Sequence, residues 1–171
     1  MQYVRASTRK YAERRLIGYS MEQLFDVVAQ VEHYHKFVPC CRKSEVIQKN
    51  DSYIKAKLEI GLPPILESYT SHVKLERPHL VIAKCIDGVL FHHLDTRWRF
   101  APGPDPLKTC HLDFNVSFEF KSLLYSRLAY LVFDEMVRLN VNAFLKRAEK
   151  LYGKQNPINE HHIGDGGNAT A

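Results

Sequence analysis

Residues 41–120 are dominated by segments in which apolar and polar side chains alternate. In SYIKAKLEI, residues 52–60, one side carries Ile54, Ala56, Leu58 and Ile60, and the other is mostly charged. A period of two is typical of a β-strand with one buried face. Similar runs follow at ILESYTSHVKLE, LVIAKCI, LFHHLDTRWRF and CHLDFNVSFEF, separated by Gly, Pro and Asp-Gly turn signals. The pattern predicts an antiparallel meander with one apolar face.

Helical spacing appears on both sides of this region. YAERRLIGY at 11–19 predicts a strand, and Ser20 is a suitable N-cap for a helix over MEQLFDVVAQV. EHYHKFVP predicts a second, short helix ended by Pro39. Residues 123–153 predict one long helix. Strands grouped together with a closing helix favour the α+β class.

The chain of 171 residues is long enough for one domain. We expect a basic N-terminal segment at 1–10, a domain at 11–153 and a disordered polar tail at 154–171, which has almost no large apolar residues. The basic segment is typical either of the tail of an organelle presequence or of an ordinary basic N-terminus.

The predicted long helix has two apolar faces. A stripe that runs from Ala129 through Phe133, Val137 and Phe144 to Leu151 is expected to pack on the concave sheet. Leu124, Leu128 and Leu131 lie nearly opposite this stripe, beside Arg127. We expect this second apolar face to be covered by an anionic membrane surface, by a loop or by a partner subunit. Spanning a bilayer is excluded, because Asp134 and Glu135 end the apolar run well short of about 20 residues.

Asn140 lies inside the apolar stripe. A buried amide needs hydrogen-bond partners. The partner is either backbone or the polar headgroup of a ligand, and the sequence leaves both open.

Charge and chemistry narrow the functional classes. The net charge of +5 and the isoelectric point near 9.0 suit anionic partners, either acidic lipid or nucleic acid. The four cysteines form no CxxC pair, which favours free thiols in a reducing compartment. His33, His35, Cys40 and Cys41 lie close in sequence but match no standard zinc spacing, so we expect no metal.

Catalytic motifs are missing from the sequence. It contains no GxSxG, P-loop, HExxH or dinucleotide-binding glycine pattern. His92 and His93 are adjacent on a predicted strand and point to opposite faces, so they are expected to be exposed hairpin residues. We therefore expect a protein that is not an enzyme and has no catalytic cofactor.

Four stretches, YHKFVPCC at 34–41, ESYTSHVKLERP at 67–78, LDTRWRF at 94–100 and NAFLKRAEKLYG at 142–153, occur in order. With the predicted layout, they resemble the mitochondrial coenzyme Q-binding protein family of the START-like (polyketide cyclase) superfamily, over residues 11–153. The resemblance implies a helix-grip fold, with the sheet wrapped around the C-terminal helix. It implies a non-catalytic chaperone for ubiquinone or a related isoprenoid lipid, supporting respiration and quinone biosynthesis. It also implies a peripheral location on the matrix side of the inner mitochondrial membrane, with quinone-biosynthesis proteins as partners.

A quinone with a polyprenyl tail needs a deep apolar cavity with few polar groups. The predicted lining comprises Leu58, Ile60, Leu66, Tyr69, Val73, Trp98, Val116 and Phe118 from the sheet and Phe133, Val137, Asn140 and Phe144 from the helix. Tyr69, Ser71, Val73 and Leu75 are taken to face inward. Glu67 shares their parity and is expected to be partly buried at the cavity mouth. The predicted membrane-docking residues are Leu124, Arg127, Leu128 and Leu131.

Two other functions stay open. One is a ribosome- or RNA-associated factor of the same fold, which the positive charge permits. The predicted strands lack the interleaved exposed aromatic and basic residues of an RNA platform, so no nucleic-acid partner is expected. The other is a cyclase-like enzyme, which the absence of an evident acid/base pair disfavours.

Overall fold

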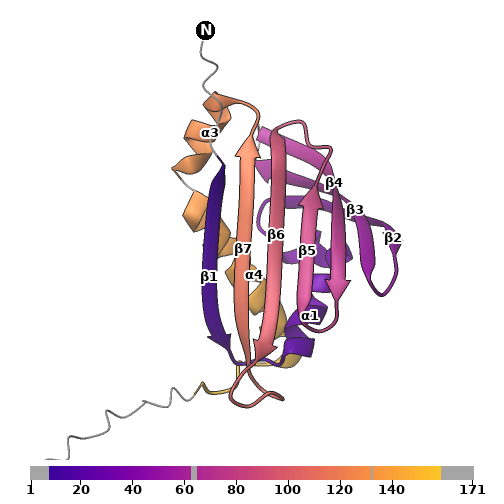
Figure 1. Ribbon diagram of the computed structural model, residues 1–171, viewed down its shortest axis with the longest axis vertical. Coiled ribbons are helices and arrows are strands. Elements are labelled where there is room, and N and C mark those ends of the chain that lie inside the picture. The colour runs from indigo at the N-terminus through magenta and orange to yellow at the C-terminus, as the bar shows by residue number, and fades with distance from the viewer. Residues whose placement is uncertain (1–7, 63–64, 132, 159–171) are drawn as a thin grey trace, which may run out of the picture.

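The computed structural model describes residues 8–62, 65–131 and 133–158 (Figure 1). Its strands are β1 (Arg9–Ile17), β2 (Cys41–Lys49), β3 (Tyr53–Leu62), β4 (Ile65–Glu76), β5 (Leu80–Cys85), β6 (Phe91–Pro102) and β7 (Cys110–Phe120). Its helices are α1 (Met21–Ala29), α2 (Tyr34–Phe37), α3 (Leu123–Tyr130) and α4 (Phe133–Tyr152), with a 3₁₀ turn at Val31–His33. The described strands form one antiparallel sheet in the order β1-β7-β6-β5-β4-β3-β2. The predicted α+β helix-grip fold is confirmed.

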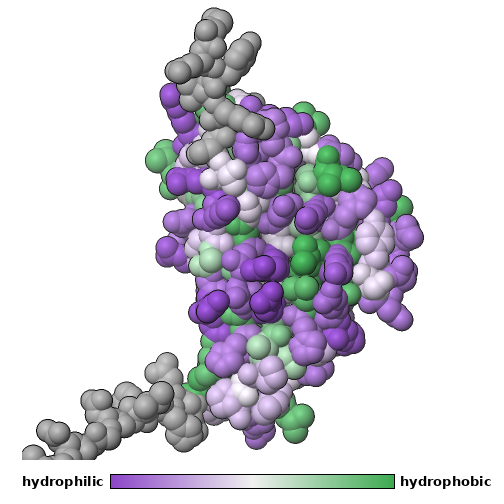
Figure 2. All heavy atoms as spheres, viewed as in Figure 1, coloured by the Kyte–Doolittle hydropathy of each residue, from purple (hydrophilic) through white to green (hydrophobic). Residues whose placement is uncertain are grey.

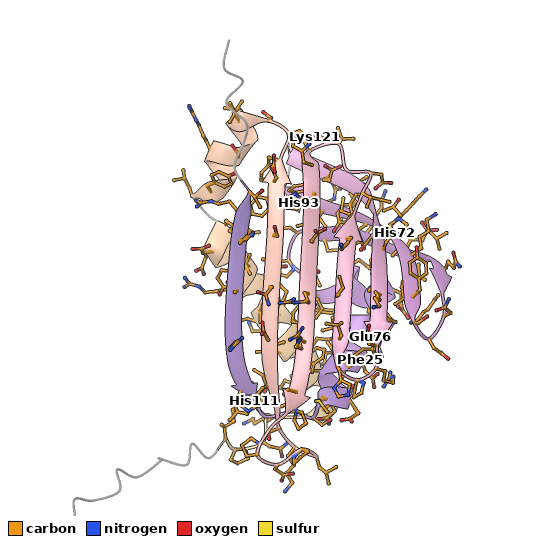
Figure 3. All side chains as sticks on the ribbon, viewed as in Figure 1. Phe25, His72, Glu76, His93, His111 and Lys121 are labelled. Carbon is orange, nitrogen blue, oxygen red and sulfur yellow. The ribbon has the colours of Figure 1, made fainter. Side chains whose placement is uncertain are left out.

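The sheet is buried on one face because its strands alternate. In β7, every second residue from Cys110 to Phe120 is buried, and the residues between them lie on the other face. Helices α1 and α4 cross the buried face, behind the sheet in Figure 1. Figure 2 shows that the opposite face is mostly hydrophilic. His72, His93 and His111 lie on that hydrophilic face (Figure 3), where the His93 Nε2 atom is 3.0 Å from the Ser117 hydroxyl.

Helix α1 begins where the sequence predicts. The Ser20 hydroxyl accepts a hydrogen bond from the Gln23 backbone N–H, and the Gln23 side chain accepts one from the Ser20 N–H. This capping box satisfies two backbone donors at the helix start. Leu24, Phe25 and Val28 then bury the apolar face of α1 in the core beneath the sheet.

The predicted single helix over 123–153 is wrong, because the structure has two helices. Helix α3 ends at Tyr130 and α4 begins at Phe133. The two helices pack on different surfaces: α3 against the end of β7, and α4 against α1 and α2. The chain turns at Leu131, between the two helices, so each helix packs on its own surface. Within the described residues, no helix has the length and apolar character needed to cross a membrane.

Beyond α4, Gln155 and Asn156 are hydrogen-bonded to the domain, so these two residues are ordered, unlike the predicted polar tail to which they belong. The Asn156 backbone N–H donates to the Gly18 carbonyl at 2.9 Å, and the Gly18 N–H donates to the Gln155 side chain at 3.0 Å. A Cβ atom at position 18 would lie 2.3 Å from the Asn156 carbonyl oxygen, which explains the glycine. The rest of the predicted tail lies outside the described residues. At the other end, Arg9 and Lys10 belong to β1 rather than to a separate basic segment.

Candidate functional site: an apolar cavity under the sheet

A cavity of about 530 Å³ lies between the concave face of the sheet and helix α4. Its size is within the range of small-molecule sites, and its lining is mostly aliphatic and aromatic. Of the twelve predicted lining residues, eleven border it: Leu58, Ile60, Tyr69, Val73, Trp98, Val116, Phe118, Phe133, Val137, Asn140 and Phe144. Whether these residues contact a ligand stays a prediction.

Leu66 is the exception, and its predicted place in the lining is wrong. Its side chain is 38% exposed, and it does not border the cavity. Consecutive strand residues face opposite sides, and the inward parity of β4 is that of Glu67, Tyr69 and Ser71. Leu66 therefore points outward by the same parity that places Tyr69 inside.

One end of the cavity is closed by aromatic rings. The ring centroid of Trp98 lies 4.4 Å from that of Phe114 and 4.7 Å from that of Phe144. Phe144 in turn meets Tyr34 edge-on at 5.2 Å. Offset and edge-to-face packing of this kind fixes ring positions. These ring contacts close this end of the cavity, which we call the aromatic end.

The opposite end is more open. The half-buried lining residues Leu90, Phe91, Phe133 and Met136 gather there, where the loop before β6 meets the start of α4. Gly61, at the end of β3, borders the same region. We call this region the mouth of the cavity. It lies at the α3 end of the molecule in Figure 1.

The sequence predicts that Glu67 is partly buried at the cavity mouth, and in the structure its side chain is more buried than that. It is only 3% exposed, and its carboxylate accepts hydrogen bonds from the backbone N–H groups of Val89, at 2.9 Å, and Leu90. On the other side of the same loop, the Lys121 ammonium donates to the Gly88 carbonyl at 2.8 Å; Figure 3 labels Lys121 at this end. Glu67 therefore holds the loop of residues 86–90 against the mouth. The Asp87-Gly88 signal indicates a turn, but nothing in the sequence pairs it with Glu67.

Asn140 has a backbone partner. Its Nδ2 group donates to the Met136 carbonyl in the preceding helical turn at 2.9 Å. Its side chain is half-buried and borders the cavity. The backbone hypothesis is confirmed for this donor, and the contact between Asn140 and a headgroup stays a prediction.

The segment that contains the vicinal cysteines forms part of the wall, which the sequence reasoning missed. Tyr34, Cys40 and Cys41 border the cavity. The Tyr34 hydroxyl donates to the Val28 carbonyl, and burial raises the pKa of Tyr34 well above its usual value. Burial also raises the pKa of the Cys41 thiol to about 11, so this thiol is protonated at neutral pH. In the part of the chain that the structure describes, no group of three or more His, Cys, Asp or Glu side chains is placed to hold a metal ion.

Three of the four predicted docking residues are exposed near the mouth. Leu124 is 66% exposed, Leu131 is 84% exposed and Arg127 is also exposed, whereas the Leu128 side chain lies outside the described part of the structure. In the loop of residues 86–90, Ile86 and Val89 are exposed as well. Exposed apolar side chains therefore occur on two separate segments at this end of the molecule (Figure 1).

Comparison with known proteins decides the family. The family model described as polyketide cyclase / dehydrase and lipid transport matches residues 17–145. The chain is 49% identical over 150 residues to the mitochondrial coenzyme Q-binding protein COQ10 homolog B of Xenopus laevis, covering 85% of this chain and 60% of that protein. It is 32% identical over 142 residues to the mitochondrial coenzyme Q-binding protein COQ10 of Dictyostelium discoideum, covering 82% of this chain and 69% of that protein. The chain belongs to the coenzyme Q-binding protein family. It spans about 60% of the length of the Xenopus relative.

More distant matches share the fold of this coenzyme Q-binding family. The ribosome association toxin RatA of Escherichia coli is 28% identical over 137 residues, covering 80% of this chain and 85% of that protein. The crystal structure of the Zhui aromatase/cyclase from Streptomyces sp. R1128 superposes with a TM-score of 0.70 at 17% identity, covering 84% of this chain and 95% of that chain. At this sequence identity, the structural similarity is evidence only for a shared fold.

Proposed function

We propose that this protein binds coenzyme Q, or a related isoprenoid quinone, in its cavity and does not transform it chemically. The observation that carries the proposal is the apolar cavity of about 530 Å³ in a chain of the coenzyme Q-binding protein family. An isoprenoid tail gains free energy from burial, at about 25 cal/mol per Å² of apolar surface. The few polar groups of the lining suit a small headgroup.

The mouth suggests how such a lipid would enter. The exposed side chains of Leu124 and Leu131, with Arg127 beside them, suit a membrane surface that carries anionic lipid. We infer peripheral docking through α3, on the matrix side of the inner mitochondrial membrane. There the protein would support respiratory electron transport and quinone biosynthesis, with biosynthetic proteins as partners.

Lipid extraction and mass spectrometry of the purified protein test the binding proposal. We expect an isoprenoid quinone to copurify, or to bind when added, and to be recovered chemically unchanged. Ala83 borders the cavity, so Ala83→Phe should fill part of it and lower quinone recovery. Ala12 lies exposed on β1, so Ala12→Phe is the matched control and should leave recovery unchanged. A wild-type protein that neither copurifies nor binds a quinone would overturn the proposal.

Ribosome or RNA association is the second candidate, favoured by the likeness to the bacterial ribosome association toxin and by the net charge of +5. It predicts nucleic-acid binding that weakens steeply with salt. Several basic side chains of the sheet are already paired with acids: Lys74 with Glu76, Arg14 with Asp113 and Arg42 with Glu59. This pairing reduces the positive field available to phosphates, so we expect weak RNA binding that does not compete with quinone.

A further inference from the structure

The polar groups of the cavity are unevenly distributed. Three consecutive inward positions of β4 carry Glu67, Tyr69 and Ser71, whereas the next two inward positions are apolar. The residues opposite on β3 are also apolar: Ile60 faces Glu67, and Leu58 faces Tyr69. Strand β4 therefore carries a short polar strip, formed by Glu67, Tyr69 and Ser71, in an otherwise apolar cavity wall.

The strip lies nearer the mouth than the aromatic end. Glu67 at its start holds the loop of residues 86–90. At the far end of β4, Leu75 is in register with Val81, and Val81 is in register with Trp98 at the aromatic end. An amphiphile bound along this axis would place its polar part on the strip and its apolar part toward Trp98.

Two hydroxyls of the strip, those of Tyr69 and Ser71, have no side-chain hydrogen bond among the described residues, and the phenolic hydroxyl of Tyr69 has the longer reach into the cavity. The Glu67 carboxylate already accepts two backbone N–H groups, and the hydroxyls of two other tyrosines have partners: Tyr34 donates to the Val28 carbonyl, and Tyr53 is 2.6 Å from the His72 ring. Among the described residues, the Tyr69 hydroxyl has no hydrogen-bond partner. Tyr69 lines the cavity, and burial is the largest cause that raises its pKa above the usual value.

A hydroxyl that opens onto an apolar cavity and has no partner among the described side chains is free to donate a hydrogen bond to a ligand atom. A quinone carbonyl oxygen is an acceptor only, and a phenolic hydroxyl is a suitable donor for it. We propose that the headgroup of the bound quinone lies against β4, where Tyr69 donates a hydrogen bond to one carbonyl oxygen and the tail runs toward Trp98 and Phe144. This assignment rests on the proposed function and names the polar subsite and the orientation of the ligand within it.

Tyr69→Phe is the direct test, because it removes one oxygen atom and keeps the ring. The probes are a ubiquinone with a short isoprenoid tail and an isoprenoid hydrocarbon of the same tail length without a headgroup. Trp98 is the single tryptophan and borders the cavity, so quenching of its fluorescence by the quinone reports binding, and the hydrocarbon is measured as a competitor. Tyr53→Phe, on the outer face, is the matched control.

We expect Tyr69→Phe to weaken ubiquinone binding about tenfold, which corresponds to one buried hydrogen bond. The inhibition constant of the hydrocarbon should stay unchanged, and Tyr53→Phe should behave as wild type. The infrared carbonyl band of the bound quinone should lie at lower frequency in wild type than in Tyr69→Phe. Without ligand, the melting temperature of Tyr69→Phe should not fall below that of wild type.

The outcomes separate this subsite from the function on which it rests. A wild-type protein that binds no quinone overturns the proposed function itself. Equal quinone affinity in wild type and Tyr69→Phe overturns the subsite and leaves the function standing. Equal loss of quinone and hydrocarbon, or a lower melting temperature without ligand, assigns Tyr69 to packing and also overturns the subsite.

Discussion

Helices α3 and α4 come from one stretch of sequence whose residue spacing predicts a single helix, yet the two helices have different surroundings. Along α4, Val137, Val141, Phe144 and Ala148 are buried against the sheet and α1. Along α3, Leu124 is exposed, and Leu131 just beyond it is more exposed still. A large apolar residue indicates burial only where the fold provides a surface to cover it. The comparison separates a helix whose apolar side chains pack into the core from one that leaves large apolar side chains exposed.

The largest effect is expected from Phe144→Ala in α4. Phe144 is 6% exposed and contacts the rings of Tyr34, Phe37 and Trp98. Its loss should lower the free energy of unfolding by about 3 kcal/mol, as for other buried Phe→Ala changes. Urea denaturation measures this. The matched change Leu131→Ala should alter it by less than about 0.5 kcal/mol. Similar costs at both positions would show that the two helices do not differ as described.

A smaller effect is expected where the loop of residues 86–90 closes the mouth beside α3. Glu67→Gln replaces one carboxylate oxygen by an NH₂ group that cannot accept the Val89 or Leu90 N–H. The lost charge-assisted bond should lower the local opening free energy of the loop by about 2 kcal/mol. Hydrogen exchange at Val89 and Leu90 measures this change. Glu76→Gln, an exposed control, should leave both amides unchanged. Unchanged exchange in Glu67→Gln would mean that the loop is held by other contacts.

The double variant Leu124→Ser/Leu131→Ser tests whether the α3 end docks on membranes. Binding to anionic liposomes should fall about tenfold, since each leucine can contribute about 1.5–3 kcal/mol when fully buried and docking buries it only partly. Co-sedimentation measures binding, and circular dichroism should show the wild-type fold. Leu107→Ser is the control, because Leu107 is also exposed but lies in the loop between β6 and β7, far from α3. If the double variant unfolds, its leucines are covered by protein and the docking proposal fails.

The smallest effect is expected in the pH dependence of the unfolding free energy, through the Cys110 thiol, which lies far from α3. Burial raises the pKa of Cys110 to about 12 from an ordinary value of 9.0. The folded state therefore keeps this proton after the unfolded state has lost it. The resulting stabilisation is complete below pH 9 and is lost as the pH rises from 9 toward 12. At pH 10 the loss is about 1 kcal/mol. Cys110→Ala should reduce, but not abolish, the alkaline decline in unfolding free energy, because buried Tyr34 and Tyr69 also resist ionisation. Identical declines in the two proteins would contradict the assignment.

Much of the site follows from local rules. Period-two alternation places Leu58, Val116 and Phe118 on the inner face, because a strand has only two faces and one of them is apolar. The same rule places Leu66 on the outer face of the sheet once Glu67 and Tyr69 are known to face inward. The hydrogen bonds that involve Glu67 and Asn156 follow from no local rule, because their partners lie more than twenty and more than one hundred residues away in the chain.

Local sequence patterns were enough to predict the class of fold, the capped start of α1, the inward parity of most strands and the absence of a membrane-spanning run, because each of these depends on neighbouring residues along the chain. The folded structure was needed to locate the break in the closing helix, the open end of the cavity and the cavity hydroxyls that have no partner among the described residues. These properties depend on surfaces that meet only when the sheet curls over α4. Tyr53 and Tyr69 belong to adjacent strands, yet the hydroxyl of Tyr53 lies beside His72 on the outer face, and that of Tyr69 faces the cavity.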